Sequence, residues 1–180
     1  MYTGIVQALV PVNDIARQPG LMSFSIDLPS EIQSGVETGA SIAINGVCLT
    51  VTAIDGPSVR FDAVAETLAL TNLKSVDDGS MVNVERSARY DAEIGGHVLA
   101  GHVSGTATVA AVERSENNCR MTFAADADWL NYVFDKGFLA INGASLTVAG
   151  LDRDGGRFYV NLIPETLRRT NFASLAVGDE

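Results

Sequence analysis

Two segments of the chain repeat one phrase and place reactive side chains at the same point in it. Residues 43–51 read AINGVCLTV and residues 140–148 read AINGASLTV. The first copy has Cys48 where the second has Ser145, and a threonine follows two residues later, Thr50 or Thr147. A thiol and a hydroxyl are both nucleophiles once they are activated. An isolated strand cysteine is usually only a small apolar residue, but the recurrence of the polar pair favours a chemical role.

The phrase itself predicts how these side chains are presented. Asn-Gly between two β-rich runs is typical of a tight hairpin, because both turn residues need a positive φ. Side chains then alternate along each strand. We expect Val47, Leu49 and Val51 to face a core and Cys48 and Thr50 to face outward, with Ser145 and Thr147 outward in the second copy.

Two histidines lie between the copies, in the segment IGGHVLAGHVSG. His97 and His102 are five residues apart and cannot share one face of a regular strand. Neither a zinc-protease pattern nor a Cys-x-x-Cys pair accompanies them, so we predict no metal site. Repeat alignment puts His102 opposite Ile5, beside a recurring glycine, and we expect His102 near Ser145 and Thr147.

A glutamate in the segment ETL follows each copy of the phrase, at Glu66 and at Glu165. A surface glutamate is usually only solvated. Its recurrence, with Thr-Asn after it, is more consistent with a hydroxyl acceptor or a helix-terminus contact.

The repeat extends over most of the chain and predicts two tandem homologous domains, residues 1–88 and 98–180. At an offset of 97 residues Gly4 aligns with Gly101 and Asp55 with Asp152, and at an offset of 99, residues 66–79 align with 165–178. Short apolar runs punctuated by Gly, Pro, Asp or Asn predict strands at 22–28, 59–64, 81–85, 106–112, 121–125 and 157–163, and hence small barrels or sandwiches. Residues 29–36, 126–134 and the two ETL segments fit short helices.

Composition excludes several function classes. The 180 residues have a formal charge of −10, which disfavours nucleic acid and anionic membranes. No apolar run suits a membrane helix, no secretion signal begins the chain, and no phosphate-binding or serine-hydrolase motif occurs. We expect a cytoplasmic protein whose ligand is neither a nucleoside triphosphate nor a dinucleotide. Cys48 and Cys119 fit two free thiols, with a single disulfide as the less favoured alternative.

Taken together, these motifs closely resemble riboflavin synthase of the trimeric, two-barrel type. The segments that carry the resemblance are MYTGIV, NGVCLTV, ETL with TNL, VNVERS, IGGHVLAGHVSG, NGASLTV and LIPETL, which span the whole chain. The resemblance implies an all-β fold of two homologous six-stranded Greek-key barrels. It also implies a cofactor-independent dismutation in which two molecules of 6,7-dimethyl-8-ribityllumazine exchange a four-carbon unit, giving riboflavin and a ribitylaminopyrimidinedione.

The resemblance also implies which residues act. Cys48 would sit beside the acceptor ring, and His102, Ser145 and Thr147 would assist proton loss from the donor methyl group. The first barrel would bind one lumazine through Gly4, Ile5, Val6, Ser41, Cys48, Leu49, Thr50, Asp62, Ala63, Val64, Ala65, Glu66 and Thr67. The second would use His97, Gly101, His102, Val103, Lys136, Ser145, Leu146, Thr147, Asn161, Leu162, Ile163, Pro164, Glu165 and Thr166. The active site would form between barrels of neighbouring subunits in a homotrimer.

The chain departs from the family pattern in three places. Tyr2 replaces the usual phenylalanine, Asn142 replaces a common aspartate, and the second copy stops at VGDE where the first continues SMVNVE. We therefore expect the second barrel to lack its closing strand in this chain, with weak trimerisation and poor activity. The alternatives are a non-catalytic lumazine- or flavin-binding antenna protein of the same fold and a barrel that binds no small ligand.

Overall fold

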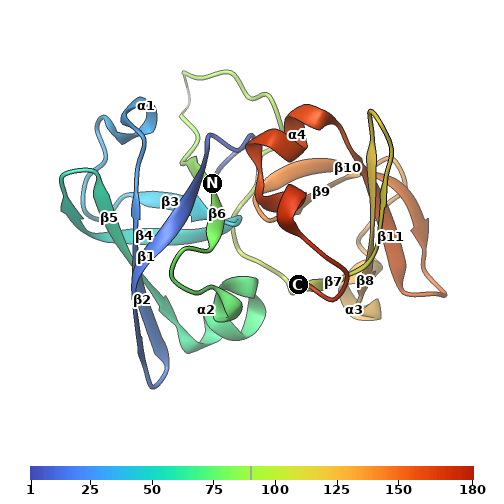
Figure 1. Cartoon of the computed structure of the whole chain (residues 1–180), viewed down its shortest axis with the longest axis horizontal. Coiled ribbons are helices and arrows are strands. Elements are labelled where there is room, and N and C mark those ends of the chain that lie inside the picture. The colour runs from blue at the N-terminus through green and yellow to red at the C-terminus, as the bar shows by residue number, and fades with distance from the viewer. Residues whose placement is uncertain (90) are drawn as a thin grey trace.

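The first half of the chain folds into a closed β-barrel. The structure is a computed structural model that describes residues 1–89 and 91–180. Its first six strands are β1 (Ala8–Gln18), β2 (Leu21–Asp27), β3 (Ser41–Ile44), β4 (Val47–Asp55), β5 (Ser58–Val64) and β6 (Met81–Arg86). The short helices between them are α1 (Ser30–Gln33), α2 (Ala65–Leu70) and the 3₁₀ helix η1 (Asn72–Ser75). The strands close in the order β1-β2-β5-β4-β3-β6. Figure 1 shows this half of the chain in blue to green.

The second half repeats this order in a five-stranded sheet. Its strands are β7 (Ala107–Arg114), β8 (Cys119–Ala125), β9 (Phe138–Ile141), β10 (Ala144–Asp152) and β11 (Arg157–Leu162), and its helices are α3 (Ala127–Leu130), α4 (Pro164–Arg169) and η2 (Asn171–Ser174). The order β7-β8-β11-β10-β9 matches the first five positions of the barrel. In the first copy β6 pairs with both β1 and β3. Among the described residues no strand joins the corresponding β7 and β9, as expected from the sequence.

Alternation of side chains gives each half its own apolar core. In the first barrel Phe24 and Phe61 meet with ring centroids 5.6 Å apart, and in the second Phe123 and Phe158 meet at 5.2 Å. Both pairs are almost fully buried. Each half therefore has the packed interior that a domain of this size needs.

The long strand β1 was absent from the sequence-based prediction. Pro11 lies within it and lacks an N–H, which argues against a regular strand. The pairing with β2 also shifts register between Asn13 and Ala16, and Asp14 there has a φ of 53°. A bulge of this kind interrupts the polar–apolar alternation by which a strand is recognised.

The segment that precedes each barrel packs on the other barrel. Val6 belongs to the core of the second half, whereas Val103 packs against the core of the first. The two segments pair through Tyr2 and Leu99, whose N–H groups each donate to the other residue's carbonyl at 3.0 and 2.9 Å. Figure 1 shows the N-terminus between the two halves.

Corresponding residues of the two copies meet at the junction. Tyr2 pairs with Leu99, and a Cβ on Gly46 would lie 2.7 Å from the backbone nitrogen of Gly143. Both pairs are 97 residues apart, which is the repeat offset. A residue contacts its own counterpart only near a symmetry axis, so the halves are related by an approximate two-fold rotation.

Candidate active site

The two repeated hairpins present their polar side chains outward. Asn45 and Gly46 have φ values of 47° and 81°, and Asn142 and Gly143 have 45° and 82°, as a type I′ turn requires. On β4, Val47, Leu49 and Val51 are buried, whereas Cys48 is half-buried and Thr50 is exposed. On β10 the half-buried Ser145 and exposed Thr147 likewise alternate with Ala144, Leu146 and Val148, which contribute to the second core. The predicted orientation of both hairpins is confirmed.

The hairpin that carries Cys48 is covered by the segment between the barrels. The backbone N–H of Cys48 donates to the carbonyl of Gly101 at 3.0 Å. A Cβ on Gly101 would lie 2.6 Å from that of Cys48, so only glycine allows this approach. The segment 101–103 therefore contacts the Cys48 hairpin through Gly101.

The hairpin that carries Ser145 is covered by the N-terminal segment in the same way. The backbone N–H of Ser145 donates to the carbonyl of Gly4 at 2.9 Å, and a Cβ on Gly4 would lie 2.5 Å from that of Ser145. The assignment of residues 4–6 to Cys48 and of residues 101–103 to Ser145 is wrong, because the two segments exchange barrels. We use the name Cys48 site for predicted residues 48–50, 62–67 and 101–103, and the name Ser145 site for predicted residues 4–6, 97, 136, 145–147 and 161–166.

The histidine beside Ser145 is His97. Its Nδ1 lies 2.7 Å from the Ser145 hydroxyl, and its ring stacks on Phe138 with centroids 3.7 Å apart. The backbone N–H of His97 donates to the carbonyl of Thr3 at 2.8 Å. We expected His102 in this position, but His102 lines a cavity between the hairpin turns and the second sheet, which does not include Ser145. The Gly-Gly before His97 is the sequence signal: a Cβ on Gly96 would collide with the Thr3 carbonyl.

The ends of β5 and β11 supply the remaining predicted residues. Asp62 and Val64 are exposed, as are Asn161 and Ile163, and each set alternates with core residues. The Ser23 hydroxyl donates to Asp62 at 2.6 Å, and the Asn118 amide donates to Asn161 at 3.2 Å. The exposed strand positions continue the polar faces of the two hairpins.

Some of the predicted ligand contacts can only be made through backbone atoms. The side chains of Leu49, Ala63 and Leu162 are buried in the cores. Leu146 is half-buried and packs on the second core. Ser41 on β3 pairs with Thr50 on β4. The Lys136 side chain is exposed, and the backbone N–H of Lys136 donates to the Val148 carbonyl at 2.9 Å.

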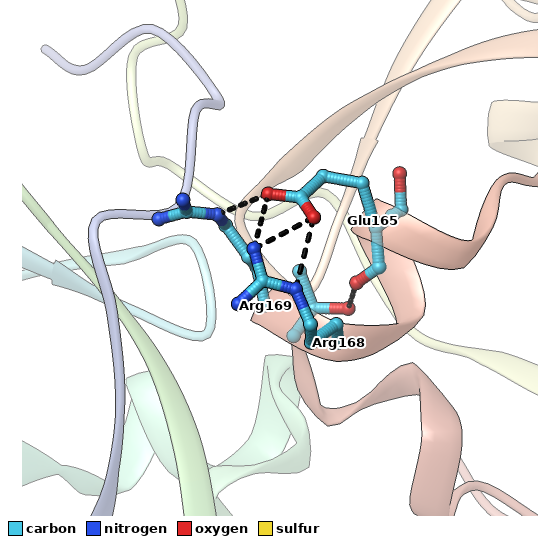
Figure 2. Close-up of polar contacts among 5 residues, drawn as sticks. Glu165, Arg168 and Arg169 are labelled. Atoms are coloured by element: carbon cyan, nitrogen blue, oxygen red, sulfur yellow. Dashed lines mark hydrogen bonds and ion pairs between the residues drawn. The ribbon is translucent and has the colours of Figure 1, made fainter.

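The two repeated glutamates differ in their surroundings. Figure 2 shows Glu165 and two arginines of α4 pointing toward one another. Arg169 Nε and Arg168 Nη2 donate to Glu165 at 2.5 and 2.7 Å, and these hydrogen bonds lower the pKa of Glu165. Glu66 is exposed, and α2 carries alanine and leucine where α4 has the arginines. Only Glu165 is therefore engaged by cations of its own helix.

Buried ionisable groups lie behind the hairpins. Burial raises the pKa of Glu85, although hydrogen bonds from Thr3 and Gly4 favour its charged form. Burial also raises the pKa of Tyr2 to about 12, and the nearby Glu85 carboxylate adds to this effect.

Buried amides link the hairpin turns: Asn83 donates to the carbonyl of Asn142 at 2.7 Å and to the side-chain oxygen of Asn171 at 2.9 Å. Asn142 thus takes part in the junction between the barrels.

A cavity of about 360 Å³ lies between the hairpin turns and the second sheet, and residues 101–103 of the Cys48 site belong to its lining. It is lined by His102, Trp129 and Leu139 but by neither Cys48 nor Ser145. The outward strand faces, and not this cavity, therefore carry the predicted nucleophiles.

Cys48 and Cys119 are both free thiols. Within residues 1–89 and 91–180, no helix has the length and apolar character to cross a membrane.

Comparison with known proteins identifies the family. The pattern of the lumazine binding domain matches residues 3–87 and again residues 100–180. The riboflavin synthase of Escherichia coli K12 is 45% identical over 179 residues, which cover 99% of this chain and 83% of that protein. The chain belongs to the riboflavin synthase family. It is thus a transferase of the lumazine-binding type, as the sequence predicts.

Solved structures with the same fold include ligand complexes. LumP complexed with 6,7-dimethyl-8-(1′-D-ribityl) lumazine superimposes with a TM-score of 0.87 at 25% identity, and LumP complexed with riboflavin with 0.89 at 26%. Each comparison covers 99% of this chain and 95% of LumP. The order of strands and the two-barrel plan are therefore shared over nearly the whole length.

Proposed function

We propose that the chain converts two molecules of 6,7-dimethyl-8-ribityllumazine into riboflavin and 5-amino-6-ribitylaminopyrimidinedione. The observation that carries the proposal is the chemical difference between two otherwise repeated sites. One hairpin offers a thiol, and the other offers a hydroxyl in contact with an imidazole. Two identical molecules that react as donor and acceptor need two such different environments.

The Ser145 site suits proton removal from the donor. We infer that the 7-methyl proton passes to the Ser145 oxygen while the hydroxyl proton passes to Nδ1 of His97, 2.7 Å away. The electron pair left on the carbon is delocalised into the pteridine ring. A histidine is an effective general base near neutral pH, and stacking on Phe138 fixes the orientation of this ring.

The Cys48 site suits the acceptor. We infer that the Cys48 sulfur adds to C7 of the acceptor ring while the thiol proton passes to a nitrogen of the same ring, which gives a neutral covalent adduct. The carbanion of the donor can then attack the activated ring. Cysteine is intrinsically more nucleophilic than serine, which accounts for the one changed side chain between the repeated phrases.

The ribityl chains have acceptors at the edges of both sites. Glu66 is exposed and can accept hydrogen bonds from ribityl hydroxyls. Glu165 is held by Arg168 and Arg169, so the second site presents guanidinium donors as well as a carboxylate. We infer that the productive pair of sites comes from different subunits of a homotrimer, with Cys48 from one chain and Ser145 from its neighbour.

The likeness to LumP keeps a binding protein without turnover as the second candidate function. The two candidates differ in one assay: purified protein is mixed with 6,7-dimethyl-8-ribityllumazine, and riboflavin is followed by its absorbance. We expect riboflavin to form without added cofactor or metal. Tight binding of the lumazine with no riboflavin, in a preparation that sediments as a trimer, would support the binding protein instead.

A further inference from the structure

Glu85 is a nearly buried carboxylate with three hydrogen-bond donors from the N-terminal segment. It lies on β6 of the first barrel and is only 4% exposed. One carboxylate oxygen accepts from the backbone N–H and the hydroxyl of Thr3, at 2.6 and 2.7 Å, and the other accepts from the N–H of Gly4 at 2.8 Å. No ion pair with Lys or Arg holds Glu85 among the described residues. The N-terminal segment is thus the partner of this charge.

The same segment holds both members of the predicted proton-transfer pair. The Gly4 carbonyl accepts from the backbone of Ser145, and the Thr3 carbonyl accepts from the backbone of His97. Val6 then anchors the segment in the second core. Residues 3 and 4 therefore lie between Glu85 on one side and the Ser145–His97 pair on the other.

We propose that Glu85 of the first barrel is a positioning residue for the Ser145 site of the second barrel. It fixes the peptide units of Thr3 and Gly4, and these fix the backbones of Ser145 and His97. Glu85 does not itself touch the substrate. The inference rests on the proposed function for its catalytic meaning, but its geometric part stands on the contacts alone.

A carboxylate is well suited to this position. The groups of Thr3 and Gly4 that face it are all donors, and an ionised carboxylate is an acceptor only. A glutamine would turn its own NH₂ group toward one of them and leave a backbone N–H unpaired. We expect Glu85→Gln to be intermediate between the wild type and Glu85→Ala.

The test measures each site separately with riboflavin as the probe. Cys119 is 1% exposed and Cys48 is half-buried on an outer face, so alkylation by iodoacetamide reads the Cys48 site. Protection of Cys48 by riboflavin gives affinity at that site, and calorimetric titration gives affinity and stoichiometry for both. The variants are Glu85→Ala, Glu85→Gln and Thr3→Val, with the exposed Glu113→Gln on β7 as the matched control.

The proposal predicts an unusual pattern, because Glu85 belongs to the barrel of Cys48. We expect Glu85→Ala to weaken riboflavin binding at the Ser145 site by roughly tenfold or more, as loss of hydrogen bonds to a charged group allows. Protection of Cys48 should be unchanged. Thr3→Val should show a smaller loss at the same site, and Glu113→Gln none. Equal losses at both sites, or a loss only at Cys48, would overturn the proposal.

Backbone amide exchange separates this proposal from the proposed function. We expect the amides of Thr3 and Gly4 to exchange faster in Glu85→Ala and Glu85→Gln than in the wild type, with no ligand present. If the wild type bound no riboflavin, the proposed function would fail. The exchange rates of the Thr3 and Gly4 amides would still test whether Glu85 holds the N-terminal segment. Unchanged exchange at residues 3 and 4 would refute the positioning role.

Discussion

At the level of single residues, the two sites share one backbone arrangement and differ in their side chains. Cys48 and Ser145 occupy the same position after the same turn, and each is covered by a glycine from the other half of the chain. Only Ser145 has an imidazole at 2.7 Å. The repeat supplies the placement, and the side chains supply the chemical asymmetry.

Replacing Cys48 by serine tests this asymmetry. Because the side chain faces outward and serine is nearly isosteric, we expect the free energy of unfolding to change by less than about 0.5 kcal/mol. Riboflavin formation should fall steeply, since a hydroxyl is a poorer nucleophile. Steady-state turnover and urea unfolding check the two statements. Normal turnover, or a variant that does not fold, would contradict the assignment.

The sequence predicted the faces of Cys48 and Ser145 but not the neighbours of Ser145. Strand alternation is local, so it determines on which side of the sheet a residue lies. The His97 contact depends on a segment that crosses from the first barrel, and no local pattern encodes that path. The same holds for Glu165. The recurring ETL motif predicted a hydroxyl acceptor or a helix-terminus contact, but it did not predict the hydrogen bonds that Arg168 and Arg169 donate to this carboxylate.

At the scale of elements, the two hairpin turns do more than reverse the chain. Gly46 and Gly143 combine a positive φ with direct backbone contact across the junction. The Asn83 amide then ties the second turn to β6. The turns therefore set both the register of their strands and the approach of the barrels.

Gly46→Ala should be much more destabilising than a matched glycine substitution. Both Gly46 and Gly79 have φ above 80°, which costs an alanine about 1–2 kcal/mol. A Cβ on Gly79 meets nothing within 4 Å, whereas one on Gly46 would lie 2.7 Å from Gly143. Urea unfolding should show a larger loss for Gly46→Ala than for Gly79→Ala. Equal losses would mean that the barrels can separate at no cost.

Elements with strong local signals were predicted well, and those with irregular backbone were not. The Asn-Gly hairpins, the short helices after β5 and β11, and the strands of alternating residues all match the structure. β1 was missed because Pro11 and the bulge near Asp14 break its pattern. Pairing with β2 and β6 stabilises this strand, and such long-range pairing leaves no trace in the local sequence.

At the scale of the whole molecule, exchange of the leading segments makes each site depend on both barrels. The repeat could not reveal this exchange. Gly4 and Gly101 align with each other, so their letters are equally compatible with packing on their own barrel or on the other one. The hydrogen bonds of Gly4 and Gly101 to the opposite hairpins decide between the two, and the packing of Val6 and Val103 on the opposite cores agrees with them.

The junction should also make stability depend on alkaline pH through Tyr2. Its pKa is about 12 in the folded chain and 10.0 as an unperturbed group. Since the folded pKa is the higher one, stability is retained below about pH 10 and lost as the pH rises toward 12, on the order of 2 kcal/mol in total. Tyr2→Phe should lack this loss. Denaturant midpoints of both proteins between pH 9 and pH 12 would diverge, and parallel curves would contradict the assignment.

In the proposed reaction, proton removal and ring activation are divided between the two sites. Exchange of the lumazine 7-methyl protons in D₂O, followed by proton NMR, measures proton removal alone. We predict that the wild type and Cys48→Ser accelerate this exchange, and that His97→Gln reduces the acceleration by about 100-fold, in the range for loss of a general base. Wild-type exchange in His97→Gln together with its loss in Cys48→Ser would contradict the account.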